Sequence, residues 1–271
     1  MRTSNFPIHL LLIIGGIAMV LPFFWMLSTS LKTPLEALRF PPTSWPSSMQ
    51  FSNYTEVFRQ IPLWRYFANT VLVTALSLFG VLATGVMAAY AFARFRFPGR
   101  EVLFMGFLAL MMIPLPVYLV PSYIILFKLG WIDTYAAMIV PWTVNIFAIF
   151  LLRQHIRQLP NDLFDAARID GCSNWTTLRK VVLPLCKAPL VTIAVFNVIA
   201  SWNSFFWPLI VTNSDKIRPL QVGLAYFSRE QTTNYTLLMA ATTLAVIPLI
   251  LLFFAAQRQI IQSQARSGLK E

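Results

Sequence analysis

Residues 69–92 read NTVLVTALSLFGVLATGVMAAYAF and contain no Asp, Glu, Lys or Arg. A helix needs about 20 apolar residues to cross the hydrocarbon core of a bilayer. A buried helix of a soluble protein is usually shorter and keeps a polar stripe on one side. This stretch therefore predicts a transmembrane helix.

Five further stretches of 19 to 26 residues also lack charged side chains. They are Leu10–Leu31, Val102–Phe127, Thr134–Leu152, Ala188–Val211 and Leu237–Gln257. All 21 basic and 10 acidic residues lie in the other half of the chain. The predicted fold class is an all-α membrane protein with six transmembrane helices, which form a single domain over residues 1–271.

The overall composition excludes other classes of protein. Only 11% of the residues are charged, against about a quarter in a soluble domain, and 57% are hydrophobic. Disorder is excluded as well, because it requires low hydrophobicity. The net charge of +11 would suit nucleic acid only if the basic residues formed a water-exposed face. Membrane lipid is the expected surrounding, and nucleic acid is not an expected partner.

The basic residues predict an orientation, because Lys and Arg are retained on the cytoplasmic side of a membrane. With the N-terminus inside, 13 of the 21 basic residues are cytoplasmic and 8 are external. The bias is sharpest in the connector 93–101, which holds Arg94, Arg96 and Arg100. Both termini are therefore expected in the cytoplasm.

The first stretch has a second interpretation as a cleaved signal peptide, with Ser28-Thr29-Ser30 as the cleavage site. Its apolar core is longer than the usual 7 to 15 residues, which favours an uncleaved anchor. Elsewhere proline shapes the expectations. The proline-rich outer loop 32–68 cannot be one helix and is expected to hold a short amphipathic helix near 54–59. Pro114, Pro116 and Pro121 predict a bend in the third span.

The inner loop 153–187 predicts a helix–turn–helix outside the membrane. Pro160-Asn161-Asp162 is a plausible start with a polar cap, and Gly171 suits the left-handed position that ends a helix. Ser173 or Asn174 then caps a second helix that runs to about Val182, where Pro184 stops it. Small residues on the first helix suit close insertion into a groove on another protein.

This loop carries a family resemblance. Asp165-Ala166-Ala167-Arg168-Ile169-Asp170-Gly171, followed by Leu183-Pro184, resembles the "EAA" loop of bacterial ABC importer permeases. Over most of its length the chain is similar to the MalG-like sugar permeases, the inner-membrane components of binding-protein-dependent sugar transport. Further matches are Lys32-Thr33-Pro34, the segment 91–99 and Ser201-Trp202-Asn203.

The resemblance implies a non-catalytic subunit whose loop docks on a separate ATPase. The implied ATPase-coupling residues are Asp165, Ala166, Ala167, Asp170, Gly171, Leu183 and Pro184. The implied partners are a second homologous permease, a dimer of ATPase subunits and an extracytoplasmic solute-binding protein, in a bacterial inner membrane. Two positions depart from the family: Asp165 stands where Glu is usual, and Ser204 replaces a common acidic residue.

Several chemistries have no support in the sequence. No Gly-Lys-Ser or Gly-Lys-Thr is present, so ATP and magnesium are expected only on the partner ATPase. Asp162 and Asp165 lack a second acidic cluster, and His9 and His155 are single residues at membrane boundaries, so no metal site is expected. Cys172 and Cys186 are expected as reduced cytoplasmic thiols. No catalytic residue is predicted.

A solute path is expected along an uncharged polar face. Asn197, Ser201 and Ser204 follow i, i+4, i+7 spacing in the fifth span, and Asn145 is an amide in the fourth. The candidate path residues are Asn145, Asn197, Ser201, Trp202, Asn203 and Ser204. Hydrogen bonding to the partner permease is an equally good interpretation.

The predicted function is that of a permease subunit in an ATP-driven importer of a sugar or similar polyhydroxy solute. The sequence does not specify the solute, because the permeases that it resembles serve maltose-like disaccharides, glycosylated compatible solutes and glycerol phosphates. The alternative is a stand-alone secondary carrier or a polytopic membrane enzyme. The spans have no ionisable residue in their middles, and ion-coupled carriers usually need one, so the carrier is the weaker interpretation.

Overall fold

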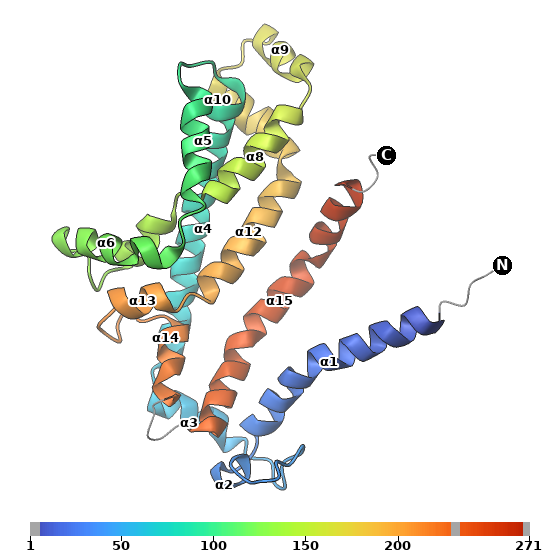
Figure 1. Cartoon of the computed structure of the whole chain (residues 1–271), viewed down its shortest axis with the longest axis vertical. Helices are drawn as coiled ribbons and strands as arrows, with labels where there is room; N and C mark the ends of the chain where they lie inside the picture. Colours follow the sequence, from blue (N-terminus) through green and yellow to red (C-terminus); the bar gives the residue numbers. More distant parts are fainter. Residues whose placement is uncertain (1–5, 229–233, 268–271) are drawn as a thin grey trace. The chain divides into compact units, whose positions relative to one another are not determined.

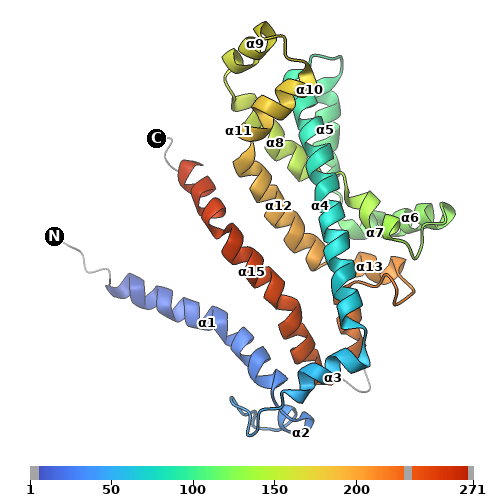
Figure 2. The ribbon, with the colours of Figure 1, turned by 180° about the vertical axis from the view of Figure 1, so that it is seen from behind.

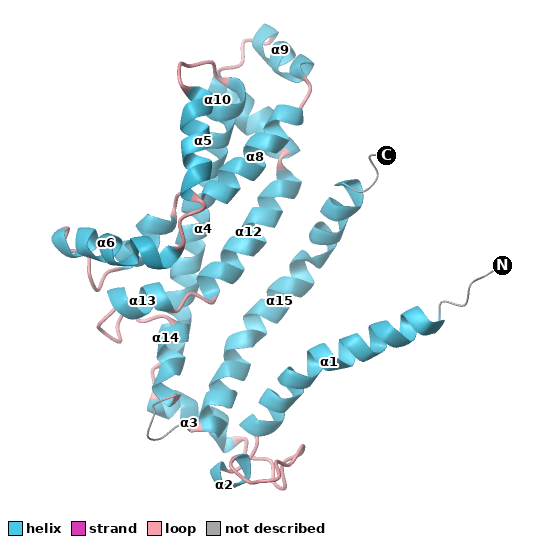
Figure 3. Cartoon of the chain, in the orientation of Figure 1, coloured by secondary structure: helices cyan, strands magenta, loops and turns pink. Residues whose placement is uncertain are grey.

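A computed structural model describes residues 6–228 and 234–267. Within these ranges every regular element is a helix, as Figure 3 shows, and no strand occurs. The α-helices are α1 (Phe6–Ser30), α2 (Pro34–Ala37), α3 (Ser52–Gln60), α4 (Leu63–Arg94), α5 (Arg100–Leu110), α6 (Leu115–Lys128), α7 (Tyr135–Ile139), α8 (Ile146–Gln158), α9 (Asn161–Ile169), α10 (Asn174–Thr177), α11 (Leu183–Leu185), α12 (Lys187–Trp202), α13 (Phe206–Val211), α14 (Leu220–Leu224) and α15 (Tyr235–Ser267). Two 3₁₀ turns, η1 (Val140–Trp142) and η3 (Ala225–Phe227), and one π-helical turn, η2 (Leu178–Val182), complete the set.

The chain divides into two compact units, each assembled from two stretches of sequence. The first unit comprises Met1–Phe67 and Leu220–Ile250, and the second comprises Ala68–Pro219 and Leu251–Glu271. Helices α4 and α15, labelled in Figure 1, each begin in the first unit and end in the second.

Four to six spans fit a membrane by length and composition. Ile8–Ser30, Leu63–Arg94, Tyr135–Gln158 and Tyr235–Ala255 each suffice as single spans. Two further helix pairs qualify only if each bent pair is one span. The predicted all-helical membrane fold is confirmed at this level. Four of the basic residues that were predicted to be cytoplasmic cannot be examined. Arg2 and Lys270 lie outside the described residues, and the side chains of Arg258 and Arg266 are not described.

The third predicted span, 102–127, is broken. Helices α5 and α6 meet at 101°, so the expected bend is present and is larger than a kink. Pro114 and Pro116 lack the N–H groups that would continue a helix from α5. The amides of Met111, Met112 and Ile113 instead make short-range bonds to carbonyls three residues earlier.

The fourth and fifth predicted spans are interrupted too. Pro141 lies in η1, and a non-helical segment separates it from α8, which runs six residues beyond the predicted end at Leu152. In the fifth, α12 ends at Trp202, and α13 starts at Phe206. The expectation of one continuous helix over 188–211 was wrong, because the Asn203 side chain bonds back to the Ile199 carbonyl and closes the helix.

The first unit contains the outer loop. As predicted, the loop is not one helix, and its amphipathic stretch forms α3. Lys32 is buried and donates to the Thr43 carbonyl, while Asn53 donates to the carbonyls of Ser30 and Lys32. These bonds fold the proline-rich segment into a compact cap after α1.

The second unit has its largest core where α4, α8 and the start of α12 pack together. Buried members of this core include Val86, Ala89, Leu152, Ile156 and Val182. Figures 1 and 2 show α9 beyond the ends of α4, α5 and α8, with α10 beside the ends of α4 and α5, at one end of this unit. A second core, with Trp207 and Met138, joins α13 to α7 further along.

Candidate functional site

Helix α9 lies in the predicted loop, and most of its predicted coupling residues face outward. Asp165, Ala166 and Asp170 are exposed, whereas Ala167 is buried against the rest of the unit. Gly171 has a φ of +70°, which confirms the left-handed helix end that its position predicted. The exposed surface of α9 therefore combines acidic and small side chains with Arg168, which pairs with Asp165, and with the strongly exposed Ile169.

The start of α9 differs from the expected polar cap. The residue that caps it is Pro160, and no side-chain capping bond forms. The Asn161 side chain is instead an acceptor for Arg94, at the end of α4. The expected cap is absent because this amide oxygen serves a tertiary contact.

Arg94 holds the junction between α8 and α9. One of its terminal nitrogens, Nη1, donates to Asn161 Oδ1 at 2.7 Å, and Nη2 donates to the carbonyls of Ile156 and Leu159, also at 2.7 Å. Its guanidinium carbon lies 3.8 Å from the centre of the Phe164 ring. A cation that bonds the last carbonyls of α8 also meets the negative end of that helix. The base of α9 is thereby attached to the end of α4.

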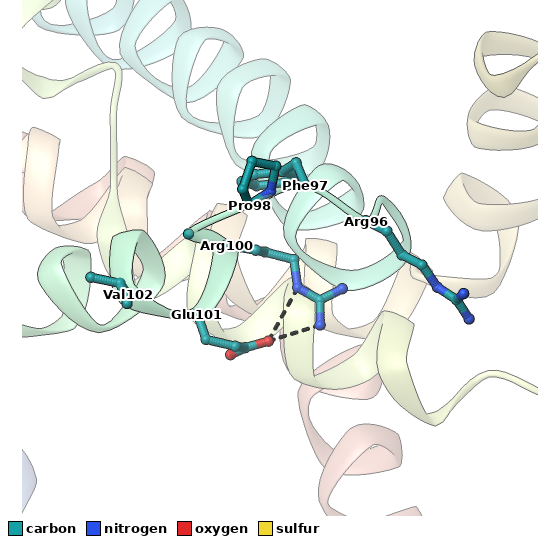
Figure 4. Close-up of a pocket in the computed structure, with 7 residues that line it drawn as sticks. Arg96, Phe97, Pro98, Arg100, Glu101 and Val102 are labelled. Atoms are coloured by element: carbon teal, nitrogen blue, oxygen red, sulfur yellow. Dashed lines mark hydrogen bonds and ion pairs between the residues drawn. The ribbon is translucent and has the colours of Figure 1, made fainter.

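An ion pair between α8 and α5 lies beside this junction. Arg153, with its side chain 3% exposed, donates to both carboxylate oxygens of Glu101 at 2.8 and 2.7 Å. Its Nε donates to the Phe92 carbonyl, and its guanidinium stacks on Phe104. Arg100 also bonds Glu101, as the dashed lines in Figure 4 show. The pair connects α8 to the start of α5.

The pKa of Glu101 reflects these neighbours. Partial desolvation raises the pKa, but the hydrogen bonds and charges of Arg153 and Arg100 outweigh it and hold the pKa below its ordinary value. The connector that precedes Glu101 turns at Pro98-Gly99, where Gly99 has φ +76° and ψ 3°, as a type II turn requires.

The second helix of the loop begins as predicted and ends differently. Ser173 caps α10 by accepting the Thr176 amide. The helical segment then continues through η2 and past Pro184 to Leu185, so the prediction that Pro184 stops it was wrong. Pro184 occupies the first turn of α11, where a missing N–H is tolerated.

Leu183 and Pro184 therefore lie at a joint, away from the α9 face. The segment Asn174–Leu185 meets α12 at 78°, and Leu183 packs against the main core. The ring nitrogen Nε2 of His155 on α8 lies 3.1 Å from the Leu185 carbonyl at this joint.

A cavity of about 420 Å³ lies elsewhere in the second unit. This volume falls in the ~300–1,000 Å³ range of small-molecule sites. Its polar lining side chains are Thr70, Ser77, Asn145, Asn197, Ser201 and Ser204. Its aromatic lining side chains are Trp142, Phe205, Phe206 and Trp207. None of the lining residues is ionisable.

The cavity brings together four predicted path residues by a route that the sequence did not indicate. Ser204 and Pro208 do not continue the face of α12 that carries Asn197 and Ser201, because that helix ends at Trp202. They line the cavity because the helix ends and the chain from Ser204 into α13 runs along the cavity. The single-face prediction was wrong, but Asn145, Asn197, Ser201 and Ser204 do share one cavity.

The polar groups of this cavity are engaged to different degrees. Asn145 caps α8 by accepting the Ala148 amide at 2.9 Å, and Ser201 Oγ lies 3.2 Å from Thr74 Oγ1. The buried Asn197 Oδ1 has no hydrogen-bond partner among the described residues. A buried carbonyl oxygen without a partner is costly, so it marks a position for a donor from a ligand or another chain.

Two predicted path residues do not line the cavity. Trp202 is 5% exposed and packs inside the unit, and Asn203 closes the end of α12. The sequence reasoning missed Thr70, Ser77 and Phe205 as lining residues. The polar positions of 69–92 gave the available signal, since Thr70, Thr74 and Ser77 follow helical spacing.

The remaining titratable groups form no further cluster in the part of the chain that is described. No group of three His, Cys, Asp or Glu side chains there is placed to hold a metal ion. Cys172 is partly exposed and Cys186 is buried, and both are free thiols.

Comparison with known proteins identifies the family. Residues 80–266, more than half of the chain, match the family described as the binding-protein-dependent transport system inner membrane component. The chain belongs to this family. It is thus a permease subunit, and the resemblance predicted from the loop and its flanking motifs is confirmed.

Individual relatives agree with this assignment. The permease is 34% identical over 226 residues to the arabinooligosaccharides transport system permease protein AraQ of Halalkalibacterium halodurans, covering 83% of this chain and 81% of that protein. It is 31% identical over 268 residues to the sn-glycerol-3-phosphate transport system permease protein UgpE of Brucella suis, covering 96% and 95%.

A solved structure shows the same fold. A chain of a bacterial ABC transporter involved in the import of the acidic polysaccharide alginate matches the permease with a TM-score of 0.83 and 24% identity. The match covers 95% of this chain and 98% of that one.

Proposed function

We propose that the permease forms half of the translocation path of an ATP-driven importer for a sugar or sugar-like polyhydroxy solute. The observation that carries this proposal is the cavity in the second unit, with amide, hydroxyl and aromatic groups and no charge. Hydroxyl-rich rings pair with such groups through hydrogen bonds and apolar faces. The named relatives transport arabinooligosaccharides and sn-glycerol-3-phosphate, which are both polyhydroxy compounds.

The uncharged lining favours a neutral solute over an anionic one. A phosphate or carboxylate in this cavity would meet no Lys or Arg of this chain. Asn197 would accept a hydrogen bond from a solute hydroxyl, which would satisfy its buried oxygen.

The proposed topology has six spans in a single transmembrane domain, with both termini and α9 in the cytoplasm. The two bent helix pairs would then each count as one span. The excess of basic residues in the connectors on that side supports this orientation. Single cysteines introduced at exposed Arg157 and at exposed Trp64 would label from opposite sides of the membrane, and labelling from the same side would contradict the topology.

The proposed assembly comprises this chain, a second homologous permease, two ATPase subunits that bind ATP and magnesium, and an extracytoplasmic solute-binding protein. All large apolar side chains of α1 from Ile8 to Trp25 are exposed, so this helix faces lipid or another chain. The chain itself would catalyse no reaction.

The proposed role of α9 is to couple ATP hydrolysis to transport. Its exposed Asp165, Ala166 and Asp170 and the adjoining Gly171 would contact the ATPase, and Arg94 would transmit the movement to α4. Ala167, Leu183 and Pro184 would act by packing and by shaping the loop and its joint.

Gly171 offers a test of this role. A Cβ atom there would meet no atom of the described residues within 4 Å, but the positive φ of Gly171 disfavours every residue except Gly, Asn and Asp. With all subunits reconstituted in liposomes, Gly171→Asn should keep the backbone and reduce sugar uptake only by crowding the partner. Gly171→Val should add backbone strain and reduce uptake further. Normal uptake and normal ATPase binding by Gly171→Val would contradict the proposed coupling role of α9.

The same reconstitution separates the proposal from a stand-alone carrier. Uptake should require the ATPase, ATP and the solute-binding protein together. Uptake by this chain alone, driven by an ion gradient, would overturn the importer proposal.

A further inference from the structure

A second cavity lies beside α9 and has the opposite chemistry to the first. It has a volume of about 1000 Å³ and lies between the α4–α5 connector and the helices α9 and α10, all within the second unit. The charged side chains that line it are Arg94, Arg96, Arg100, Asp165 and Arg168. Four cations and one anion give the lining a formal charge of +3.

Three of these arginines already have partners. Arg94 is bound to α8 and α9, Arg100 pairs with Glu101, and Arg168 pairs with Asp165 at 3.4 Å. Arg96 has no hydrogen bond or ion pair with any described residue, and it is exposed. In Figure 4 its side chain extends away from the Arg100–Glu101 pair. Arg96 is therefore the guanidinium of this lining that is free to bind another molecule.

We propose that this basic groove, defined by Arg96 and the other charged residues above, receives a carboxylate-bearing segment of the ATPase subunit. The inference rests on the proposed function, because it requires that α9 docks on an ATPase. The groove adjoins α9, so a partner that covers the exposed surface of α9 extends over the groove as well. Asn161, Asn174 and Thr177 also line it and supply further polar groups for a peptide.

The docking surface then has two signs of charge. Asp162 on α9 and Asp170 just after its end are exposed outside the groove, whereas four arginines and Asp165, which pairs with Arg168, line the groove. A matching ATPase surface presents basic residues to α9 and acidic residues to the groove. Two patches of opposite sign fix the orientation of a partner better than one, since a rotated complex brings like charges together.

A lipid headgroup is the other anion that such a groove could bind. The uncharged part of the lining combines the amides of Asn161 and Asn174 with aromatic rings, among them Phe95 and Phe97. A carboxylate segment that also brings backbone donors and acceptors suits this mixture better than a headgroup does.

Charge reversal at Arg96 tests the proposal in the full complex. Arg96→Glu should lower the affinity of the ATPase subunit for the permease in nanodiscs at least about tenfold at low salt. Arg96→Lys keeps the charge and should stay within about threefold of the wild type. Arg157→Glu makes the same charge change at an exposed arginine outside the groove, and it should have little effect. Arg96 has no hydrogen-bond or ion-pair partner among the described residues, so the Arg96 variants should not disturb folding.

Cys172 supplies a second readout because it lines the same groove. The other cysteine, Cys186, is 1% exposed and should not react. A maleimide should label Cys172 in the permease alone and much more slowly in the ATPase complex. Arg96→Glu should restore labelling at an ATPase concentration that protects the wild type.

The outcomes are distinct. Equal ATPase affinity of Arg96→Glu and wild type would overturn the proposal. If Arg96→Glu leaves the affinity for the ATPase unchanged but makes this affinity independent of the phosphatidylglycerol content of the nanodisc, the proposal would be overturned in favour of a lipid headgroup. Failure of the wild type to bind an ATPase at all would overturn the proposed function itself and this inference with it.

Discussion

The two ends of the second unit are stabilised by different kinds of polar contact. At the α9 end, the guanidinium groups of Arg94 and Arg153 each make several short hydrogen bonds to carbonyls or carboxylate and stack on a ring. At the cavity end, single hydroxyl and amide contacts such as Thr74–Ser201 link helices, and Asn197 leaves an oxygen unpaired.

This difference matches what each end is proposed to do. An element that passes on a partner's movement must not slip against its neighbours, and charge-assisted bonds in a fixed planar geometry prevent slipping. A cavity that binds and then releases a solute needs polar groups whose intrachain bonds are few and weak. Four experiments test this contrast, and the first should show the largest effect.

Arg94→Ala removes three hydrogen bonds at the base of α9. Bonds to a charged group contribute roughly 1.5–3 kcal/mol each, so the junction should loosen and uptake should fall at least ~100-fold. Arg94→Lys keeps the charge but cannot reproduce the planar set of donors, and it should retain an intermediate rate. ATPase activity measured in the same liposomes should persist, because the ATPase would hydrolyse ATP without moving solute. Near-normal uptake by Arg94→Ala would show that transport does not need the charge-assisted bonds at the α9 end, which would contradict the contrast between the two ends.

Asn197→Ala should lower sugar uptake roughly tenfold, because one or two hydrogen bonds to a solute hydroxyl would be lost. The melting temperature should not fall. Stability should hold because the Asn197 oxygen has no partner in the described chain. Thr192→Val, on the same helix, removes a bond to the Ala188 carbonyl away from the cavity and should leave uptake unchanged. A clear loss of stability in Asn197→Ala would show that this amide is structural.

Glu101→Gln should weaken the connection between α5 and α8 and flatten the response of stability to acid. The pKa of Glu101 is lowered in the folded chain, so its stabilisation is complete above its unfolded pKa, near 4.5, and is lost as the pH falls through the folded pKa. Thermal unfolding in detergent between pH 3 and 6 measures this directly. The wild type should lose stability across that range, and Glu101→Gln should lose less. Parallel profiles would mean that the pair contributes nothing.

Asp133→Asn should have the smallest effect. Asp133 has a φ of 62° and accepts the amides of Asn213 and Ser214, beside α13 at the cavity end. The Ser214 backbone bond is the main cause that holds the pKa of Asp133 below its ordinary value. Asn tolerates the same backbone and keeps an acceptor, so the loss should be about 1 kcal/mol with uptake unchanged. A tenfold drop in uptake would show that transport at the cavity end depends on a charged side chain, contrary to the proposed contrast.

The sequence predicted the elements more successfully than their joints. Six uncharged stretches identified the apolar segments because charge inside a bilayer is costly, and Gly171 located a helix end because few residues adopt its φ. The right-angle break after Leu110 was out of reach, since Pro114, Pro116 and Pro121 permit a bend at several places.

The candidate site residues show the same difference between positions within one helix and positions at a joint. Asn197 and Ser201 could be predicted because they share a helix face, but Ser204 lies after the helix break at Asn203 and lines the cavity from outside that face. Arg94 was seen as a topology signal, and its role at α9 was not predicted. Its partners are mostly backbone carbonyls, which every residue has, so no residue pattern reveals them.

The break between α5 and α6 also bears on how the chain is made. A ribosome-bound insertion machine meets 102–127 as 26 uncharged residues, enough for one crossing. Once folded, the eleven residues of α5 extend only about 16 Å, roughly half of the hydrocarbon thickness. Backbone groups at the bend cannot remain exposed to lipid tails. In the proposed six-span topology the bend would therefore be completed after insertion, when other helices can shield it, and biogenesis would include a folding step inside the bilayer.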